Sequence, residues 1–137
     1  MLRILVLWKD DYGVGIPDID EQHKHLFDIA NRISELLANE LLVDKYDHIV
    51  AVLNELREYT IEHFAAEEAY MIEHKYRKLL SHKALHHDFI EKIDAVDLNQ
   101  IDNEQNLYLK DILNFVTEWL ISHILQEDKQ IGGLSEQ

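Results

Sequence analysis

Seven side chains of types that bind metal ions lie in four separate stretches of the chain. They are His23, His63, Glu67, His82, His86, His123 and Asp128. Glu67 follows His63 by four residues, and the same spacing separates His82 from His86. Side chains at this spacing lie one turn apart on one helix face, so each pair could chelate a single ion. Because the chain has no cysteine, imidazole and carboxylate are the available ligands, and they suit iron, zinc, copper or manganese.

Both four-residue pairs occupy stripes that are otherwise apolar. An uncompensated imidazole or carboxylate buried there would carry a desolvation cost of several kcal/mol. Taken singly, each residue has an ordinary explanation: a core histidine can bond to a carbonyl, and Glu67 could be solvated beside Glu68. Seven such groups on the inward faces of four helices together favour a buried metal site.

The step from His123 to Asp128 is five residues, which does not suit a regular helix. At about 100° per residue, it turns the second side chain roughly 140° away from the first. Either the last turn is wound wider, as in a π-bulge, or Asp128 reaches back from a fraying end. Glu127 has the better spacing and is the competing ligand on geometry alone.

Five imidazoles and two carboxylates exceed what one small transition ion needs, which indicates two ions. Each carboxylate has two oxygens, so Glu67 and Asp128 are the expected bridges. Di-iron sites that activate dioxygen for oxidation are usually rich in carboxylates with Glu-x-x-His motifs, and this sequence contains none. A nitrogen-rich set stabilises high oxidation states less well, which favours binding dioxygen over breaking it.

Four amphipathic stretches are expected to position these ligands. Apolar residues recur at spacings of three and four through roughly 19–41, 44–74, 79–96 and 103–130, with Asp18 or Asp20 as a plausible N-cap of the first helix. Residues 1–17 show no sustained helical period and are expected to form an irregular arm. Its apolar residues should pack on the bundle, namely Leu5, Leu7, Trp8 and Ile16. Short connections make neighbouring helices antiparallel. We therefore expect one all-α domain over 1–137, an up-down-up-down four-helix bundle with a two-metal site in its core.

The charge balance excludes several partners. Asp and Glu number 27 against 13 Lys and Arg, a formal charge of -14 that disfavours nucleic acid and anionic membrane surfaces. The apolar run from Met1 to Trp8 is too short for a signal sequence or a membrane span. We expect a cytoplasmic protein without membrane insertion.

With these residues assembled, the chain resembles the hemerythrin family, specifically single-domain bacterial hemerythrins. The matching segments are Trp8 with YGVGI at 12–16, DEQHKHLF at 20–27, HFAAEE at 63–68, HKALH at 82–86, and His123-Ile124 with Asp128. The family pattern of histidine followed five positions later by aspartate favours Asp128 over Glu127. The resemblance implies an up-down-up-down bundle that holds two irons.

Carried over by position, the resemblance implies that His82, His86 and His123 fill the terminal positions of one iron. Glu67, Asp128 and a solvent-derived oxo or hydroxo group would bridge this iron to the second.

The resemblance further implies that His23 and His63 hold the second iron, which keeps one open position. Dioxygen would bind there end-on as a hydroperoxide. The pocket over this position would be lined by Leu26, Phe64, Trp119, Leu120 and Ile124. The other four histidines, His25, His48, His74 and His87, match no ligand position and are assigned to the surface or to the surroundings of the ligands.

The leading hypothesis is a reversible dioxygen-binding protein for storage, delivery or buffering, not an enzyme. One alternative is a di-iron enzyme acting on peroxide or nitric oxide, but no acid or base beyond the ligands can be named for it. A stand-alone oxygen sensor is the other alternative, although sensors usually carry an output domain. Delivery would also require an oxygen-consuming partner protein.

Overall fold

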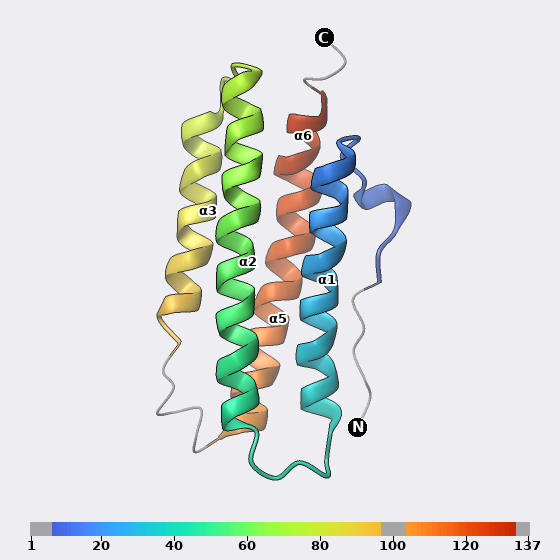
Figure 1. The fold of residues 1–137 in the computed structure, drawn as a ribbon, viewed down its shortest axis with the longest axis vertical. Coiled ribbons are helices and arrows are strands. Elements are labelled where there is room, and N and C mark those ends of the chain that lie inside the picture. Colours follow the sequence, from blue (N-terminus) through green and yellow to red (C-terminus); the bar gives the residue numbers. More distant parts are fainter. Residues whose placement is uncertain (1–6, 97–103, 134–137) are drawn as a thin grey trace.

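Four long helices run antiparallel to their neighbours along the length of the molecule (Figure 1). The computed structural model describes residues 7–96 and 104–133. The helices are α1 (Pro17–Ala38), α2 (Tyr46–Glu73), α3 (Leu79–Asp94), α5 (Gln105–His123) and the short α6 (Lys129–Gly132), with a 3-10 turn at Asp10–Tyr12 and a π-helical turn at Ile124–Asp128. The described residues contain no strand. The predicted all-α, up-down-up-down four-helix bundle is confirmed.

Packing of apolar faces holds the bundle together. Helix α1 packs against α2 and α5, and α2 packs against α3. Each long helix contributes fully buried side chains to one continuous core, for example Ile33, Leu56, Phe89 and Val116. Burying one side chain of this kind stabilises the fold by roughly 1.5–3 kcal/mol. This core sets the rotation of each helix and so decides which polar residues must face inward.

The first helix begins earlier than the expected N-caps. Pro17 is its first residue, a favoured place for proline because the missing N–H would have no helical partner there. The prediction of Asp18 or Asp20 as N-cap is therefore wrong. The Asp20 carboxylate instead accepts a hydrogen bond of 2.8 Å from the Val14 N–H, and so ties the arm to α1.

Side-chain hydrogen bonds in the α1–α2 connection make α1 end earlier, and α2 begin later, than the sequence predicts. The Asn39 carboxamide oxygen accepts the Leu41 N–H, and the Asp44 carboxylate accepts the Tyr46 N–H. Both bonds span two residues and compete with helical bonding. As a result, α1 ends at Ala38 and α2 begins at Tyr46. The expected start of the last helix at residue 103 lies outside the described residues, as do residues 1–6 of the arm.

The arm packs on the bundle through aromatic rings. Trp8 and Tyr12 contact each other and both contact Phe27 of α1, with ring centroids 5.4–5.8 Å apart. Ile16 also packs on the core. Leu7, in contrast, is 65% exposed, so its predicted packing is wrong. The arm therefore lies beside the end of the bundle where α1 begins (Figure 1).

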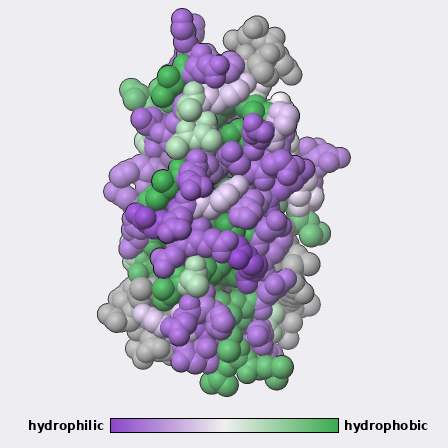
Figure 2. Space-filling model, in the orientation of Figure 1, coloured by the Kyte–Doolittle hydropathy of each residue, from purple (hydrophilic) through white to green (hydrophobic). Residues whose placement is uncertain are grey.

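Hydrophilic residues cover most of the face shown in Figure 2. A hydrophobic area gathers at the lower end, where the α1–α2 connection leaves Leu41 96% and Val43 92% exposed. Within the described residues, none of the helices combines the length and apolar character that crossing a bilayer requires.

Candidate metal centre

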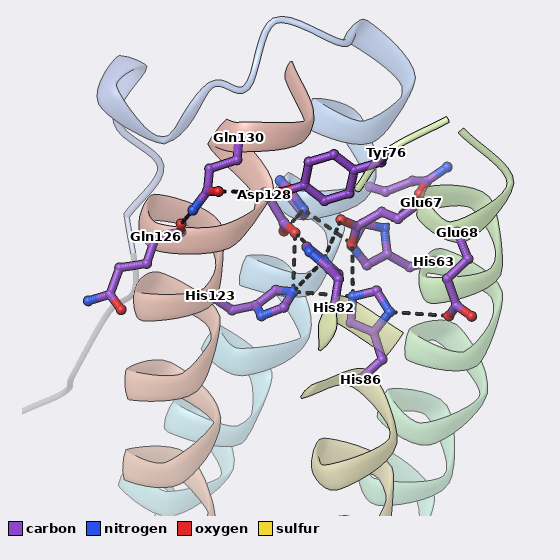
Figure 3. Close-up of polar contacts among 12 residues, drawn as sticks. His63, Glu67, Glu68, Tyr76, His82, His86, His123, Gln126, Asp128 and Gln130 are labelled. Atoms are coloured by element: carbon purple, nitrogen blue, oxygen red, sulfur yellow. Dashed lines mark hydrogen bonds and ion pairs between the residues drawn. The ribbon is translucent and has the colours of Figure 1, made fainter. Parts of the chain in front are cut away.

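All seven predicted ligands converge inside the bundle, near the end where α2 turns into α3 (Figure 3). Helix α1 supplies His23, α2 supplies two ligands, α3 supplies two, α5 supplies His123 and the π-helical turn supplies Asp128. None of the seven is more than 6% exposed. Polar groups so deeply buried need partners, and the closest partners available are the other six.

Three imidazoles form one group. The Nε2 atom of His123 lies 3.2 Å from that of His86 and 3.1 Å from that of His82. Neighbouring ligands at right angles around one ion, with bonds of about 2.1 Å, would be about 3.0 Å apart. The spacing of these nitrogens therefore fits three ligands on one face of a single metal ion.

Asp128 lies between this group and the histidines of α1 and α2. Its Oδ1 is 3.0 Å from Nε2 of His82 and 3.1 Å from Nε2 of His123, whereas its Oδ2 is 3.0 Å from Nε2 of His23. The two oxygens thus face two different sets of imidazoles. This is the placement that a bridging carboxylate requires.

Glu67 also contacts both sets of imidazoles, although its Oε1 is near histidines of both, with Nε2 of His86 3.8 Å away. Its Oε1 is 2.5 Å from Nε2 of His63, and its Oε2 is 3.7 Å from Nε2 of His82. The potential ligand atoms form two overlapping groups, each with all its atoms within 4.8 Å of one another. One group holds Glu67, His82, His86, His123 and Asp128, and the other holds His23, His63, Glu67 and Asp128. Both carboxylates belong to both groups, which fits two neighbouring ions.

Several buried atoms in this cluster have no hydrogen-bond partner among the described residues. Two of them are Nδ1 of His23 and Nδ1 of His82. The others, which face neighbouring members of the cluster, are both oxygens of Glu67, both oxygens of Asp128 and Nε2 of His23. Nearby imidazoles are close enough for ion pairs but are not aligned to donate. Leaving a buried polar group unsatisfied costs roughly 1–3 kcal/mol. Metal ions bound to these atoms would remove that cost.

The electrostatics of the cluster favour cations. Burial would lower the pKa of His23, but the close negative charges of Asp128 and Glu67 raise this pKa to about 9. The same balance raises the pKa of His82 to about 9. Burial lowers the pKa of His86 to about 3. Without metal, the two carboxylates therefore hold protons on neighbouring imidazoles, at positions where metal ions would compete with them.

A local change of helix type brings Asp128 into the site. The turn Ile124–Asp128 is π-helical, which winds the chain wider than an α-helix. Of the two alternatives for the five-residue step, the structure shows the wider turn. Glu127 does not enter the cluster and instead lines a groove on the surface.

Two further residues touch the outer nitrogens of the imidazoles. The Gln22 side-chain oxygen lies 2.7 Å from Nδ1 of His63, and a Glu68 oxygen lies 3.2 Å from Nδ1 of His86. Sequence reasoning did not assign roles to Gln22 or Glu68. The sequence offers one signal for them, which is that Gln22 is adjacent to His23 and Glu68 to Glu67. Their contacts with His63 and His86 depend on how the helices face each other, which residue spacing does not reveal.

The five residues predicted to line the pocket lie in or against the core. Leu26, Phe64, Leu120 and Ile124 are buried, and Trp119 is half-buried against them. The aromatic rings also contact the three-histidine group. Phe64 stacks on His86 with centroids 3.8 Å apart, and Trp119 stacks on His123 at 4.3 Å.

The other four histidines stay outside the cluster. His48, His74 and His87 are exposed, and His25 is half-exposed against the ring of Tyr59.

Comparisons with known proteins agree with this geometry. A family model described as "Hemerythrin HHE cation binding domain" matches residues 14–134. The bacteriohemerythrin of Clostridium acetobutylicum is 43% identical over 92% of this chain and 98% of its own, and that of Pseudomonas aeruginosa is 31% identical over 90% and 76%. A crystal structure of wild-type hemerythrin superposes with a TM-score of 0.77 at 25% identity, covering 98% of this chain and 100% of that chain.

Proposed function

Since the chain belongs to the hemerythrin family, we propose that it is a non-haem di-iron protein that binds dioxygen reversibly, for storage, delivery or buffering. The observation that supports this best is the division of seven buried ligands into two nitrogen-rich groups that share two carboxylates. This donor set suits a pair of ions that exchange electrons with a small ligand without reaching high oxidation states.

In this proposal, three histidines of α3 and α5 hold one iron and His23 and His63 hold the other. Iron held there would supply two electrons, and the solvent-derived hydroxo group one proton, so that dioxygen is held as hydroperoxide on the two-histidine side. The electrons and the proton would return on release. Glu67 and Asp128 would hold the two irons next to each other, because each carboxylate belongs to both groups of ligands.

The apolar residues around the cluster would protect the bound state. Leu26, Leu120 and Ile124 are at most 2% exposed, and the Phe64 ring contacts that of His63, with centroids 5.7 Å apart. A dry apolar shell limits the entry of water and protons, which would promote irreversible oxidation. We assign these side chains to the dioxygen pocket that the family resemblance implies.

Among the described residues, the only buried charged side chain outside the cluster is Lys45. Its ammonium bonds to Asn106 and to the Leu37 carbonyl, far from the cluster at the opposite end of the bundle (Figure 1). Within residues 7–96 and 104–133, we therefore assign no further buried acid or base to chemistry on peroxide or nitric oxide.

Anaerobic loading with ferrous iron tests the proposal. Two irons per chain are expected, and air should produce a peroxide-to-ferric charge-transfer band that disappears when dioxygen is removed. Iron that oxidises once and never recovers, or fewer than two irons per chain, would contradict the proposal. Steady consumption of peroxide or nitric oxide by the loaded protein would favour the enzyme instead.

A further inference from the structure

One imidazole of each set is backed by a side-chain acceptor, and the two acceptors differ in charge. His86 and His63 both direct Nε2 into the cluster, so with a metal bound at Nε2 the proton of each ring is on Nδ1 and is donated outward. His86 donates to the Glu68 carboxylate at 3.2 Å, whereas His63 donates to the Gln22 carboxamide oxygen at 2.7 Å. Figure 3 shows Glu68 on the outer side of His86. One acceptor is an anion and the other is neutral.

We propose that this asymmetry makes Glu68 a positioning residue that lowers the reduction potential of the three-histidine iron, while Gln22 leaves that of the two-histidine iron higher. The inference rests on the proposed di-iron function. A hydrogen bond to an ionised acceptor is roughly twice as strong as one between neutral groups. It also makes the imidazole a better electron donor to its metal. A richer donor stabilises the ferric ion more than the ferrous ion.

Ion pairing does little to screen the Glu68 carboxylate at this position. Its side chain is 22% exposed, and its one cationic neighbour in an ion pair among the described residues is Lys83, with 3.7 Å between Nζ and Oε1. An exposed pair at this distance is weak, so it does not neutralise the carboxylate. The ring of His86 is also held by stacking on Phe64, which fixes the direction of its N–H.

The asymmetry has a consequence for reversible binding. The three-histidine iron does not contact dioxygen in the proposed function, yet it must give up an electron when dioxygen binds. Glu68 makes this electron easier to remove. Gln22 adds no negative charge beside the other iron, so the ferric state there is less favoured and the electron returns more easily on release.

Exchanging the two acceptors tests the proposal. Glu68→Gln should weaken ferric relative to ferrous binding about tenfold, which raises one potential by about 59 mV for a single electron. Gln22→Glu should lower the other potential. Both are measured by anaerobic spectroelectrochemical titration without dioxygen, after iron is counted. Glu58→Gln is the matched control, because it removes the same charge from exposed α2 surface ten residues, roughly 15 Å, away.

Shifts of opposite sign in the two variants, with no comparable shift in Glu58→Gln, support the proposal. Equal shifts in Glu68→Gln and Glu58→Gln overturn it, because they would reflect net charge alone. Glu68→Asp keeps the anion and should restore a potential near that of the parent. If Glu68→Gln loses its iron, an unchanged potential in Gln22→Glu still overturns the proposal. A parent protein that cannot hold two irons contradicts the proposed function itself.

Discussion

His123 and Asp128 lie five residues apart and yet meet on the same side of their helix, with Nε2 of His123 3.1 Å from Oδ1 of Asp128. The π-helical turn between them makes this contact possible. A π-turn adds a residue to the helical repeat, so a side chain at the fifth position returns to the face of the first. The same turn sends Glu127 to the surface groove.

Replacing the carboxylate by a carboxamide at Asp128 and, separately, at Glu127 tests whether the π-helical turn directs Asp128 and not Glu127 into the cluster. Asp128→Asn should reduce bound iron below two per chain, since it removes the charge that faces both groups of imidazoles. Glu127→Gln should leave the iron content unchanged. Metal analysis after anaerobic loading measures both, and a greater loss in Glu127→Gln would show that the last turn is regular helix in solution.

Two histidines of α3 provide a second matched pair. His82 is 1% exposed within the three-histidine group, whereas the exposed His87 pairs with Glu91 on the surface. Losing an outer hydrogen bond to a ligand typically costs roughly 10–100-fold in metal affinity, and losing the ligand should cost more. His82→Ala should therefore lose iron and the oxygenated band, and His87→Ala should keep both. Equal loss in the two variants would refute the assignment.

Metal binding should release protons. Neutral imidazole is the form that binds a metal, and the pKa of about 9 keeps His23 and His82 protonated at pH 7.5. Loading with zinc or ferrous iron at that pH should release one proton from each, detectable with a pH indicator. The apparent affinity should rise with pH up to about 9, and acid should release the metal. Proton release near zero would mean that both imidazoles are already neutral.

Whereas the metal affinity should rise with pH, the free energy of unfolding of the metal-free protein should fall. Because the folded pKa of His23 and of His82 exceeds the ordinary value of 6.5, their protonation stabilises the fold. This contribution is complete below pH 6.5 and is lost as pH rises through about 9. The free energy of unfolding in urea, measured with a chelator present, should therefore fall over this interval. An increase would contradict the charge balance described for the cluster.

The two C-terminal glycines should differ in their tolerance of a side chain. A Cβ at Gly132 would lie 1.8 Å from the Val14 carbonyl oxygen, while one at Gly133 would meet no atom within 4 Å. Gly132→Ala should lower the free energy of unfolding by about 1–3 kcal/mol, because the arm must move away. Gly133→Ala should change it by less than about 0.5 kcal/mol. Urea unfolding measures both, and equal stabilities would mean that the arm does not pack on Gly132 in solution.

The sequence was informative where a regular period controls the structure. Apolar residues three and four apart predict the four helices, and ligands spaced four apart on those stripes predict the cluster. Helix ends were harder, because the side chains of Asn39 and Asp20 stop or redirect the chain through local bonds that no period encodes. The acceptors Gln22 and Glu68 depend on the rotation of one helix against another, which only the packed structure reveals.

The central claim is that the cluster takes up dioxygen and gives it back. An oxygen electrode, applied to protein loaded anaerobically with two ferrous ions per chain, tests it most directly. One dioxygen should be taken up per pair of irons, and the same amount should return when dioxygen is removed. Uptake that is never returned, with water or free peroxide as its product, would contradict reversible binding at this site.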